Sequence, residues 1–447
     1  MRTLLVIQKD DPYFLFETLR VIEKNYNAFK DFKLTLLVDE KSLKEVYKDT
    51  SPLIKEITLD ETGCASTHYD ISVNLSLNES SWSLHGNINS SKKLGPYFKD
   101  GLLQVEDLWS SYLLTLKSKT PFLTFHLQDI YKNILGIKDF QIREERPFTI
   151  REFAIGLSAS HVFPSGEQEL FIEKLSQMYP VYPVKDVSEV DLISDVSHTL
   201  YIGPPTLQSL KLCEAGAHAI FISSGFRGFN LLPSENTYYL MSSRGEKFEA
   251  APLLKFIQDK LSQKNNSPCP YALYRCDNEQ GFGSYLKSLN SSDDHYPFYQ
   301  SHVVLWNFLL NLFDADLDIT RCSAEQVTLL KNNSDVLKKV IRLHDYAMSS
   351  VDHVYQEAKS KLSNGSKIDE YIKHLLEIDK LSDQIASSHP FLRPVLDFYR
   401  IRRGQNQGNS LLEQAQTSLL TYSEEHQALQ ALQELFSVTL RKNEVNI

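Results

Sequence analysis

The segment LLVIQKDDPYFLFETLRVI, residues 4–22, decides how the first part of the chain folds. It opens with a continuous apolar run at 4–7, which is typical of a strand buried on both faces of a parallel sheet. After a polar turn at 8–11, apolar residues recur at helical spacing from Pro12, and proline is well tolerated at the start of a helix. The segment therefore predicts the first strand, turn and helix of a Rossmann-like unit.

Apolar runs continue to alternate with helical patterns as far as residue 223. In the first series, strands are expected at 4–8, 34–38, 54–59 and 71–75, and helices at 12–29, 42–47, 106–116 and 127–135. A polar loop is expected from residue 76 to Ser91, and a charged linker at 138–147.

A second series then begins. Its strands are expected at 153–157, 181–184, 200–202 and 219–223, and its helices at 167–178, 188–196 and 207–215. The chain is therefore predicted to be an α/β protein with two Rossmann-like domains in tandem, at 1–143 and 148–245.

From residue 250 the strand signals fade and long helical patterns follow, so an all-α C-terminal domain is expected at 250–447. Its helices are expected at 253–264, 302–312, 324–349, 368–385 and 411–440. Their apolar stripes favour an internal helical core. A surface for a protein partner or for self-association is the alternative.

Composition excludes several classes of function. The net charge of −10 argues against a nucleic-acid partner, because nucleic acids require a basic surface. Five scattered cysteines without a CxxC pair predict reduced thiols and no metal site. The N-terminus lacks a signal-peptide pattern, and the longest dense apolar stretch, 303–313, is too short for a bilayer, so a cytoplasmic location is expected. Motifs of nucleotide hydrolases, nicotinamide enzymes, zinc proteases and serine hydrolases are absent.

Two acidic residues, Asp10 and Asp11, follow the first predicted strand. Doubly wound sheets bind ligands beyond the carboxyl ends of their strands, so a carboxylate in this turn faces the binding crevice. There it could act as a general base towards a sugar hydroxyl. The alternative is structural, since either residue could cap the helix that begins at Pro12.

Small and hydroxyl residues follow two strands of the second series. Ser158, Ser160 and His161 follow one strand, and Gly203 and Thr206 follow another. Backbone amides at such turns, in front of a helix, are suited to binding phosphate groups. An ordinary turn capped by Ser or Thr is the alternative.

These stretches resemble glycosyltransferase family 9, the heptosyltransferase-like enzymes of the GT-B fold. The family opens with a strand, a small-residue loop and Gly-Asp before a helix; residues 5–19 resemble this segment, with Asp11 on the catalytic Asp and Asp10 in place of the Gly. Residues 69–76, 92–96, 109–114 and 125–136 are similar to further elements of the family's acceptor domain.

The second half resembles the family's donor domain. Residues 155–160 are similar to a strand and turn of that domain, and residues 200–222 are similar to its Asp-Thr-Gly-Pro element and the helix after it. The resemblance implies donor-binding roles for Ser158, Ser160, His161, Gly203, Thr206, Gly216, Ser224, Gly225 and Arg227. Three charged or polar family residues are lost, because Pro205 replaces an Asp, Leu210 replaces a His, and a Lys has no counterpart.

The resemblance covers residues 1–245 and implies an inverting, metal-independent glycosyltransferase without a bound cofactor. A nucleotide-sugar would be the donor, and a cell-envelope or protein-linked glycan, a lipid-linked glycan or a protein the acceptor. Asp11 would deprotonate the acceptor hydroxyl. The lost residues leave a second hypothesis open: an inactive relative that binds a partner through its helical domain.

The densest basic cluster, residues 400–403, lies in the helical region. It could contact an anionic lipid surface or an acidic partner. The alternative is a solvated helix end that stops at Gly404.

Overall fold

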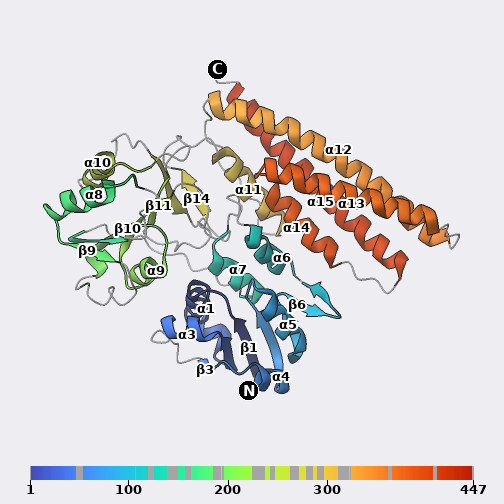
Figure 1. Cartoon of the computed structure of the whole chain (residues 1–447), viewed down its shortest axis with the longest axis horizontal. Coiled ribbons are helices and arrows are strands. Elements are labelled where there is room, and N and C mark those ends of the chain that lie inside the picture. Colours follow the sequence, from blue (N-terminus) through green and yellow to red (C-terminus); the bar gives the residue numbers. More distant parts are fainter. Residues whose placement is uncertain are drawn as a thin grey trace.

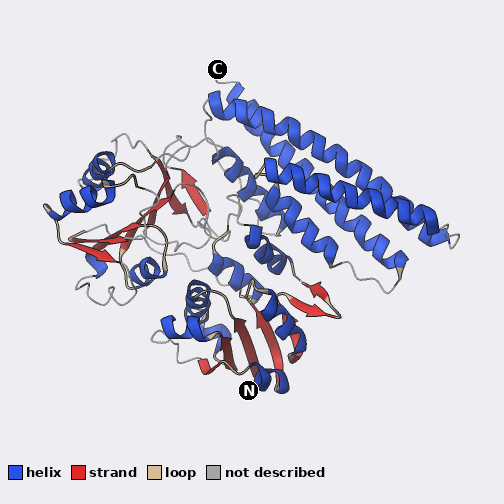
Figure 2. Ribbon diagram, viewed as in Figure 1, coloured by secondary structure: helices blue, strands red, loops and turns tan. Residues whose placement is uncertain are grey.

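Two α/β units and a helical region make up the protein (Figure 1). The structure is a computed structural model and describes residues 2–46, 54–105, 107–118, 125–137, 150–156, 163–184, 193, 196–223, 237–241, 247–261, 271–277, 285–288, 296–310, 322, 324–360, 365–405 and 410–444. Figure 2 shows the strands gathered in the two α/β units and long helices alone in the third part. The predicted fold class is confirmed.

The first unit contains a five-stranded parallel sheet in the order β3-β2-β1-β4-β5. Its strands are β1 (Arg2–Gln8), β2 (Phe32–Val38), β3 (Ile54–Thr58), β4 (His68–Asn74) and β5 (Asn89–Leu94). Residues 4–7 of β1 are buried, as a central strand covered on both faces requires. This strand order matches the first five strands of the Rossmann order 3-2-1-4-5-6.

The helices and the hairpin of the first unit follow these strands. They are α1 (Pro12–Lys24), α2 (Tyr26–Phe29), α3 (Glu40–Val46), α4 (Glu61–Ser66), α5 (Glu79–Asn87), the hairpin β6 (Tyr97–Lys99) and β7 (Leu102–Gln104), α6 (Leu108–Thr115), the 3₁₀ turn η2 (Leu116–Ser118) and α7 (Leu127–Ile134). Side-chain caps begin several of them: Asp60 starts α4, Asn78 starts α5 and Asp107 starts α6.

The expectation of a polar loop from residue 76 to Ser91 was wrong, because α5 and the start of β5 lie there. The residues that α5 buries include Ser81 and His85, so the helix has no apolar stripe that could reveal it. β5 is an edge strand with no fully buried residue, so it lacks a continuous apolar run. The predicted linker at 138–147 lies outside the described residues.

The second unit contains a seven-stranded sheet in the order β14-β13-β12-β11-β10-β8-β9. Its strands are β8 (Glu152–Gly156), β9 (Val181–Val184), β10 (Thr199–Gly203), β11 (His218–Ser223), β12 (Thr237–Met241), β13 (Ala272–Asp277) and β14 (Tyr285–Ser288). The helices are α8 (Glu167–Ser176), the 3₁₀ turn η5 (Val196–His198), α9 (Leu207–Glu214) and α10 (Ala250–Leu261). Most of the helix expected at 188–196 lies outside the described residues.

The sheet of the second unit extends beyond the boundary expected at residue 245. β13 pairs antiparallel with β12, and β14 pairs antiparallel with β13. These strands are short and were not predicted, and the strands of the chain therefore continue to Ser288 rather than fading from residue 250.

Five helices form the described part of the C-terminal region. They are α11 (Tyr296–Leu309), α12 (Ala324–Ser360), α13 (Gly365–Ser388), α14 (Arg393–Gly404) and α15 (Leu411–Glu444). α12 and α15 lie side by side along most of their length (Figure 1). Ala428, Leu429 and Leu432 of α15 are completely buried, in a core that is continuous with that of the first unit.

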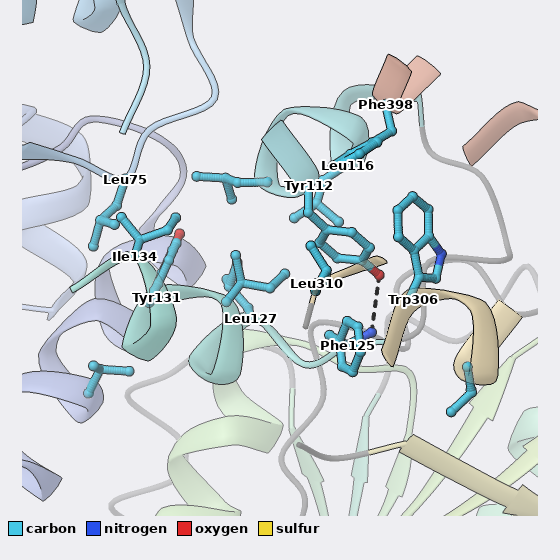
Figure 3. Packing of buried hydrophobic residues seen from close by; sticks show 14 of the residues in the cluster. Leu75, Tyr112, Leu116, Phe125, Leu127, Tyr131, Ile134, Trp306, Leu310 and Phe398 are labelled. Atoms are coloured by element: carbon cyan, nitrogen blue, oxygen red, sulfur yellow. Dashed lines mark hydrogen bonds between the residues drawn. The ribbon is translucent and has the colours of Figure 1, made fainter. Parts of the chain in front are cut away.

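An aromatic cluster joins the helical region to the first α/β unit (Figure 3). The ring of Trp306 in α11 meets Tyr112 of α6 edge-on, with centroids 4.8 Å apart, and Phe398 of α14 at 5.2 Å. The hydroxyl of Tyr112 accepts a 3.2 Å hydrogen bond from the backbone amide of Phe125, just before α7. The helical region is thus anchored on the two helices that complete the first unit.

The basic cluster lies at the end of α14, which stops at Gly404 as the structural alternative expected, but its side chains are ion-paired rather than only solvated. Arg400 pairs with Asp383 and Asp397, Arg402 with Glu424, and Arg403 with Glu425 and Asp379. Carboxylates of α13 and α15, together with Asp397 of α14 itself, therefore neutralise the cluster.

None of the helices in the described segments combines the length and apolar character that a bilayer crossing requires.

Candidate functional site

The switch point of the first sheet lies between β1 and β4, where the order of the strands reverses. In an open α/β sheet, a ligand binds in the crevice that the turns after two such strands create. Here those turns are residues 9–11 after β1 and residues 75–78 after β4. Catalytic or ligand-binding side chains are therefore expected in these two turns.

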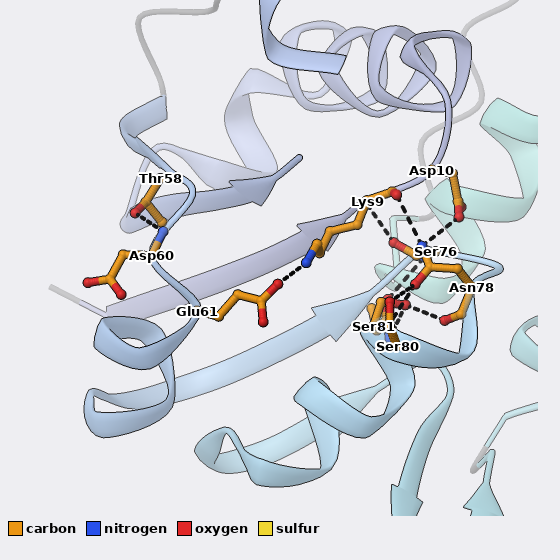
Figure 4. Close-up of polar contacts among 10 residues, drawn as sticks. Lys9, Asp10, Thr58, Asp60, Glu61, Ser76, Asn78, Ser80 and Ser81 are labelled. Atoms are coloured by element: carbon orange, nitrogen blue, oxygen red, sulfur yellow. Dashed lines mark hydrogen bonds and ion pairs between the residues drawn. The ribbon is translucent and has the colours of Figure 1, made fainter. Parts of the chain in front are cut away.

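Asp10 ties the two turns together (Figure 4). Its Oδ2 accepts a 2.7 Å hydrogen bond from the backbone amide of Leu77, and its Oδ1 accepts one of 2.9 Å from Nδ2 of Asn78. Burial raises the pKa of Asp10, although these hydrogen bonds act in the opposite direction. Both carboxylate oxygens of Asp10 are thus used within the fold.

A buried polar network supports these turns from below. Oε1 of Gln8 accepts a 3.1 Å hydrogen bond from the amide of Asp10, and the hydroxyl of Ser76 accepts one of 2.7 Å from the amide of Lys9. Nε2 of Gln8 donates to the hydroxyl of Tyr131 in α7, at 2.9 Å. The crevice floor is therefore held in place before any ligand arrives.

Asp11 behaves differently from its neighbour. It occupies the N-cap position of α1, but its side chain makes no capping hydrogen bond, and the residue is exposed. Its backbone carbonyl accepts the amide of Phe14 at 2.9 Å, so the start of the helix fixes the backbone of Asp11. Neither Asp10 nor Asp11 caps α1 with its side chain, and Asp11 is the carboxylate presented to solvent at the switch point.

Lys9 directly precedes this carboxylate pair in the sequence, but its ammonium group is engaged elsewhere. Nζ of Lys9 forms an ion pair with Glu61 at the start of α4 (Figure 4). Within the described residues, no group of His, Cys, Asp and Glu has the arrangement of a metal site.

The switch point of the second sheet lies between β8 and β10. Gly203 ends β10, and Gly156 ends β8. A Cβ at Gly203 would lie 2.6 Å from the hydroxyl of Tyr201, and one at Gly156 would lie 2.1 Å from it. Both glycines therefore make room for Tyr201, whose hydroxyl donates to the carbonyl of Pro204 at 2.8 Å.

Thr206 begins α9 as one half of a capping box. Its hydroxyl accepts the amide of Ser209 at 3.3 Å, and its own amide donates to the hydroxyl of Ser209 at 2.8 Å. The structural alternative raised by the sequence is thus present at this turn. A donor-binding role for Thr206 remains a prediction.

Gly216 lies apart from the other predicted donor residues. It follows α9, at the end opposite Thr206, and adopts a φ of 109° that favours glycine. Its amide donates to the carbonyl of Cys213 at 3.1 Å, so it terminates the helix. The remaining predicted donor residues, Ser158, Ser160, His161, Ser224, Gly225 and Arg227, lie outside the described residues.

The helices that follow the two switch-point turns contact each other. α1, which begins at the crevice of the first sheet, contacts α9, which begins at the edge of the second (Figure 1). Leu15 and Leu19 of α1 belong to the same buried cluster as Leu207 and Leu210 of α9. Leu210, at the place where the family resemblance has a His, is therefore a buried apolar residue of this cluster.

Sequence reasoning missed Asn78 and Ser76, which complete the first site. Their partners lie 67–69 residues away, so only the pairing of β1 with β4 brings them together. Asn78 followed by Glu79 is a helix-start signal that the sequence did contain.

No family model matches the chain, and no curated protein matches it. Several solved glycosyltransferases are similar to it. Heptosyltransferase WaaC of E. coli with ADP is 10% identical with a TM-score of 0.36, and the match covers 58% of this chain and 98% of that one. A family 9 glycosyltransferase of Veillonella parvula is 11% identical with a TM-score of 0.35, covering 59% and 89%. The dodecameric glycosyltransferase TibC of enterotoxigenic E. coli is 12% identical with a TM-score of 0.29, covering 50% and 58%.

Proposed function

We propose that this protein is an inverting glycosyltransferase. It moves a sugar from a nucleotide-sugar donor to a hydroxyl group of a glycan, lipid-linked or protein acceptor in the cytoplasm. One observation carries the proposal: an exposed carboxylate, Asp11, stands at the switch point of an α/β sheet, beside an aspartate whose oxygens are already engaged.

In the proposed reaction, Asp11 takes the proton of the acceptor hydroxyl as its oxygen attacks the anomeric carbon. The bond between that carbon and the diphosphate oxygen breaks on the opposite face, and the nucleoside diphosphate leaves. Backbone amides at 158–161 and at the start of α9 would meet its developing charge, so no metal is required. Because the amide of Thr206 is engaged by Ser209, the amide of Leu207 is the better candidate at this turn.

A second candidate function is that of a partner-binding protein without catalysis. The turn after β10 in the second sheet favours it, because its predicted donor residues have structural roles. Gly203 is explained by packing against Tyr201, and Thr206 by its capping box. A protein of this class would act through the helical region, residues 296–444, by binding a partner or a second copy.

A donor screen separates the two functions. The purified protein is titrated with UDP-, GDP-, ADP- and CMP-sugars, and binding is followed by thermal shift and calorimetry. A donor present at about 100 times its Kd stabilises the folded state by about 2.7 kcal/mol, which raises Tm by a few degrees. Selective binding of one donor supports the enzyme; no response to any of them, from a folded sample, favours the partner-binding protein.

Replacing Asp11 tests the catalytic role. In Asp11→Asn we expect donor binding to persist and the transfer rate to fall by about 100-fold or more, because the general base is lost. The control is Asp100→Asn, at an exposed aspartate in the hairpin turn, where φ is 51° and asparagine is well accommodated. A wild-type transfer rate in Asp11→Asn would exclude Asp11 as the base.

A further inference from the structure

Asp10 has no role in the proposed reaction, yet both its side chain and its backbone are hydrogen-bonded. Its carboxylate accepts hydrogen bonds from the backbone amide of Leu77 and the side-chain amide of Asn78. Its own backbone amide donates to Oε1 of Gln8 at 3.1 Å, and its backbone carbonyl accepts a hydrogen bond from the hydroxyl of Ser42 at 2.7 Å. Side-chain and backbone groups of this one residue thus connect the turn after β1 to β4, to α3 and to the strand beneath.

The two groups that contact the carboxylate of Asp10 are both fixed as hydrogen-bond donors. Leu77 offers a backbone amide, which can only donate, and Asn78 offers its side-chain amide. The other end of the Asn78 side chain, Oδ1, already accepts the amide of Ser81 at 2.8 Å as the cap of α5. Asn78 therefore cannot turn its amide around without losing that cap, and the site requires two acceptors at Asp10.

A comparable hydrogen-bonded bridge exists at the opposite end of the same two strands, near their N-termini. Oδ2 of Asp70 in β4 accepts the amide of Thr3 in β1 at 2.6 Å and its hydroxyl at 3.0 Å. Hydrogen bonds from Thr3 lower the pKa of Asp70, whereas burial raises that of Asp10. The strands are thus already tied at one end, and the bridge at Asp10 adds a constraint at the end where the reaction is proposed.

We propose that Asp10 is a positioning residue, whose bridge to Leu77 and Asn78 fixes the location of Asp11 over the crevice. This inference rests on the proposed glycosyl transfer. Asp11 directly follows Asp10 and makes no capping bond of its own, so the bridge at Asp10 and the backbone of α1 are what hold it. Displacing a reacting group by about 1 Å can lower a rate by about 100-fold.

Exchanging the partners tests the bridge. Asp10→Asn replaces one acceptor oxygen by an NH₂ group, which then faces the NH₂ group of Asn78. Asn78→Asp places a second carboxylate against that of Asp10, while its other oxygen can still accept the amide of Ser81. In the double variant, an amide at position 10 faces a carboxylate at position 78, so the hydrogen bond re-forms in reverse. The bond from Asn78 to the carbonyl of Lys9, 3.1 Å, is not restored, so recovery is partial.

We expect kcat to fall about 10- to 100-fold in each single variant, with the donor KM unchanged, and to recover most of the loss in the double variant. Asp70→Asn is the matched control: it removes the comparable bridge at the far edge and is expected to lower Tm without changing kcat. Hydrogen exchange at the amide of Leu77 reports the bridge independently of activity, and it should accelerate in Asp10→Asn and slow again in the double variant.

The failures are distinguishable. An active wild type whose kcat does not change in Asp10→Asn, or falls equally in Asp70→Asn, overturns the positioning role and leaves the proposed function standing. Unchanged exchange at Leu77 in Asp10→Asn overturns the bridge itself. A wild type that transfers no sugar from any donor overturns the proposed function, and the positioning role falls with it.

Discussion

Asp10 at the edge of the first sheet and Glu425 in the helical region are both withdrawn from water, but they are held by different kinds of partner. Neutral amides bind Asp10, in the turn after β1. Glu425 is completely buried and faces Arg403, with His344 3.6 Å away. A network of neutral donors fixes geometry next to a solvent-exposed carboxylate, whereas a network of charges joins helices to one another.

The charged network connects four helices. Arg403 of α14 pairs with Glu425 of α15 and with Asp379 of α13, and its guanidinium lies 4.5 Å from the ring centre of Tyr422. His344 of α12 completes the group, and burial lowers its pKa to about 3. Arg403 is therefore the cation that the acids Glu425 and Asp379 share, and the pairing between the helices depends on it.

At a pKa of about 3, the imidazole of His344 is neutral near pH 7, so Arg403 is the cation that Glu425 faces. Burial raises the pKa of Glu425 to about 8, and the charge of Arg403 only partly opposes this. The helical cluster is therefore sensitive to any change in charge, in contrast to the neutral network around Asp10.

The largest effect on stability is expected from Arg403→Ala. The substitution leaves Glu425 and Asp379 without their shared cation and removes the contact with Tyr422. Removing one partner of a buried ion pair costs about 3–5 kcal/mol, and we expect this loss in the free energy of unfolding, measured by urea denaturation above pH 8, where Glu425 is ionised. Arg400→Ala is the control, because Arg400 is half exposed and its ion pairs lie nearer the surface. An equal loss in both variants would mean that the cluster has no special role.

An effect of similar size is expected in the pH dependence of stability. The pKa of Glu425 rises from its ordinary 4.5 to about 8 on folding, so between these values the folded chain binds more protons than the unfolded chain. The free energy of unfolding should therefore decrease as pH rises through this window, and Glu425→Gln should remove that part of the slope. Denaturation at several pH values measures it. Glu424→Gln, at the more exposed neighbour paired with Arg402, should keep the wild-type slope; a wild-type slope in Glu425→Gln would refute the assignment.

Most of the fold could be predicted from the sequence, because its central strands carry their own signals. β1, β2, β10 and β11 lie inside their sheets, so they read as continuous apolar runs. The edge strand β5 is partly polar and was missed, but so were β12, β13 and β14, of which β12 and β13 lie inside their sheet. A continuous apolar run is therefore a strong signal for a buried strand, but not every interior strand carries one.

The site could be predicted only in part. Asp10 and Asp11 both follow β1, and composition cannot tell which of two adjacent carboxylates turns inward. That depends on Leu77 and Asn78, which are far along the chain and arrive through the pairing of β4 with β1. Gly203 and Thr206 were predicted from the type of turn they form, and the same features also serve packing and capping.

The smallest effect is expected from Tyr131→Phe, beneath the crevice. The hydroxyl of Tyr131 accepts Nε2 of Gln8 at 2.9 Å, and Gln8 also has the carbonyl of Leu75 at 3.3 Å as an acceptor. Because the amide of Gln8 keeps that second partner and the ring is retained, we expect a loss of about 1 kcal/mol in the free energy of unfolding. Urea denaturation measures it, with Tyr346→Phe at an exposed tyrosine of α12 as the control. A loss as large as that of Arg403→Ala would show that the neutral network, like the charged one, is essential to the fold, and the contrast between the two regions would then disappear.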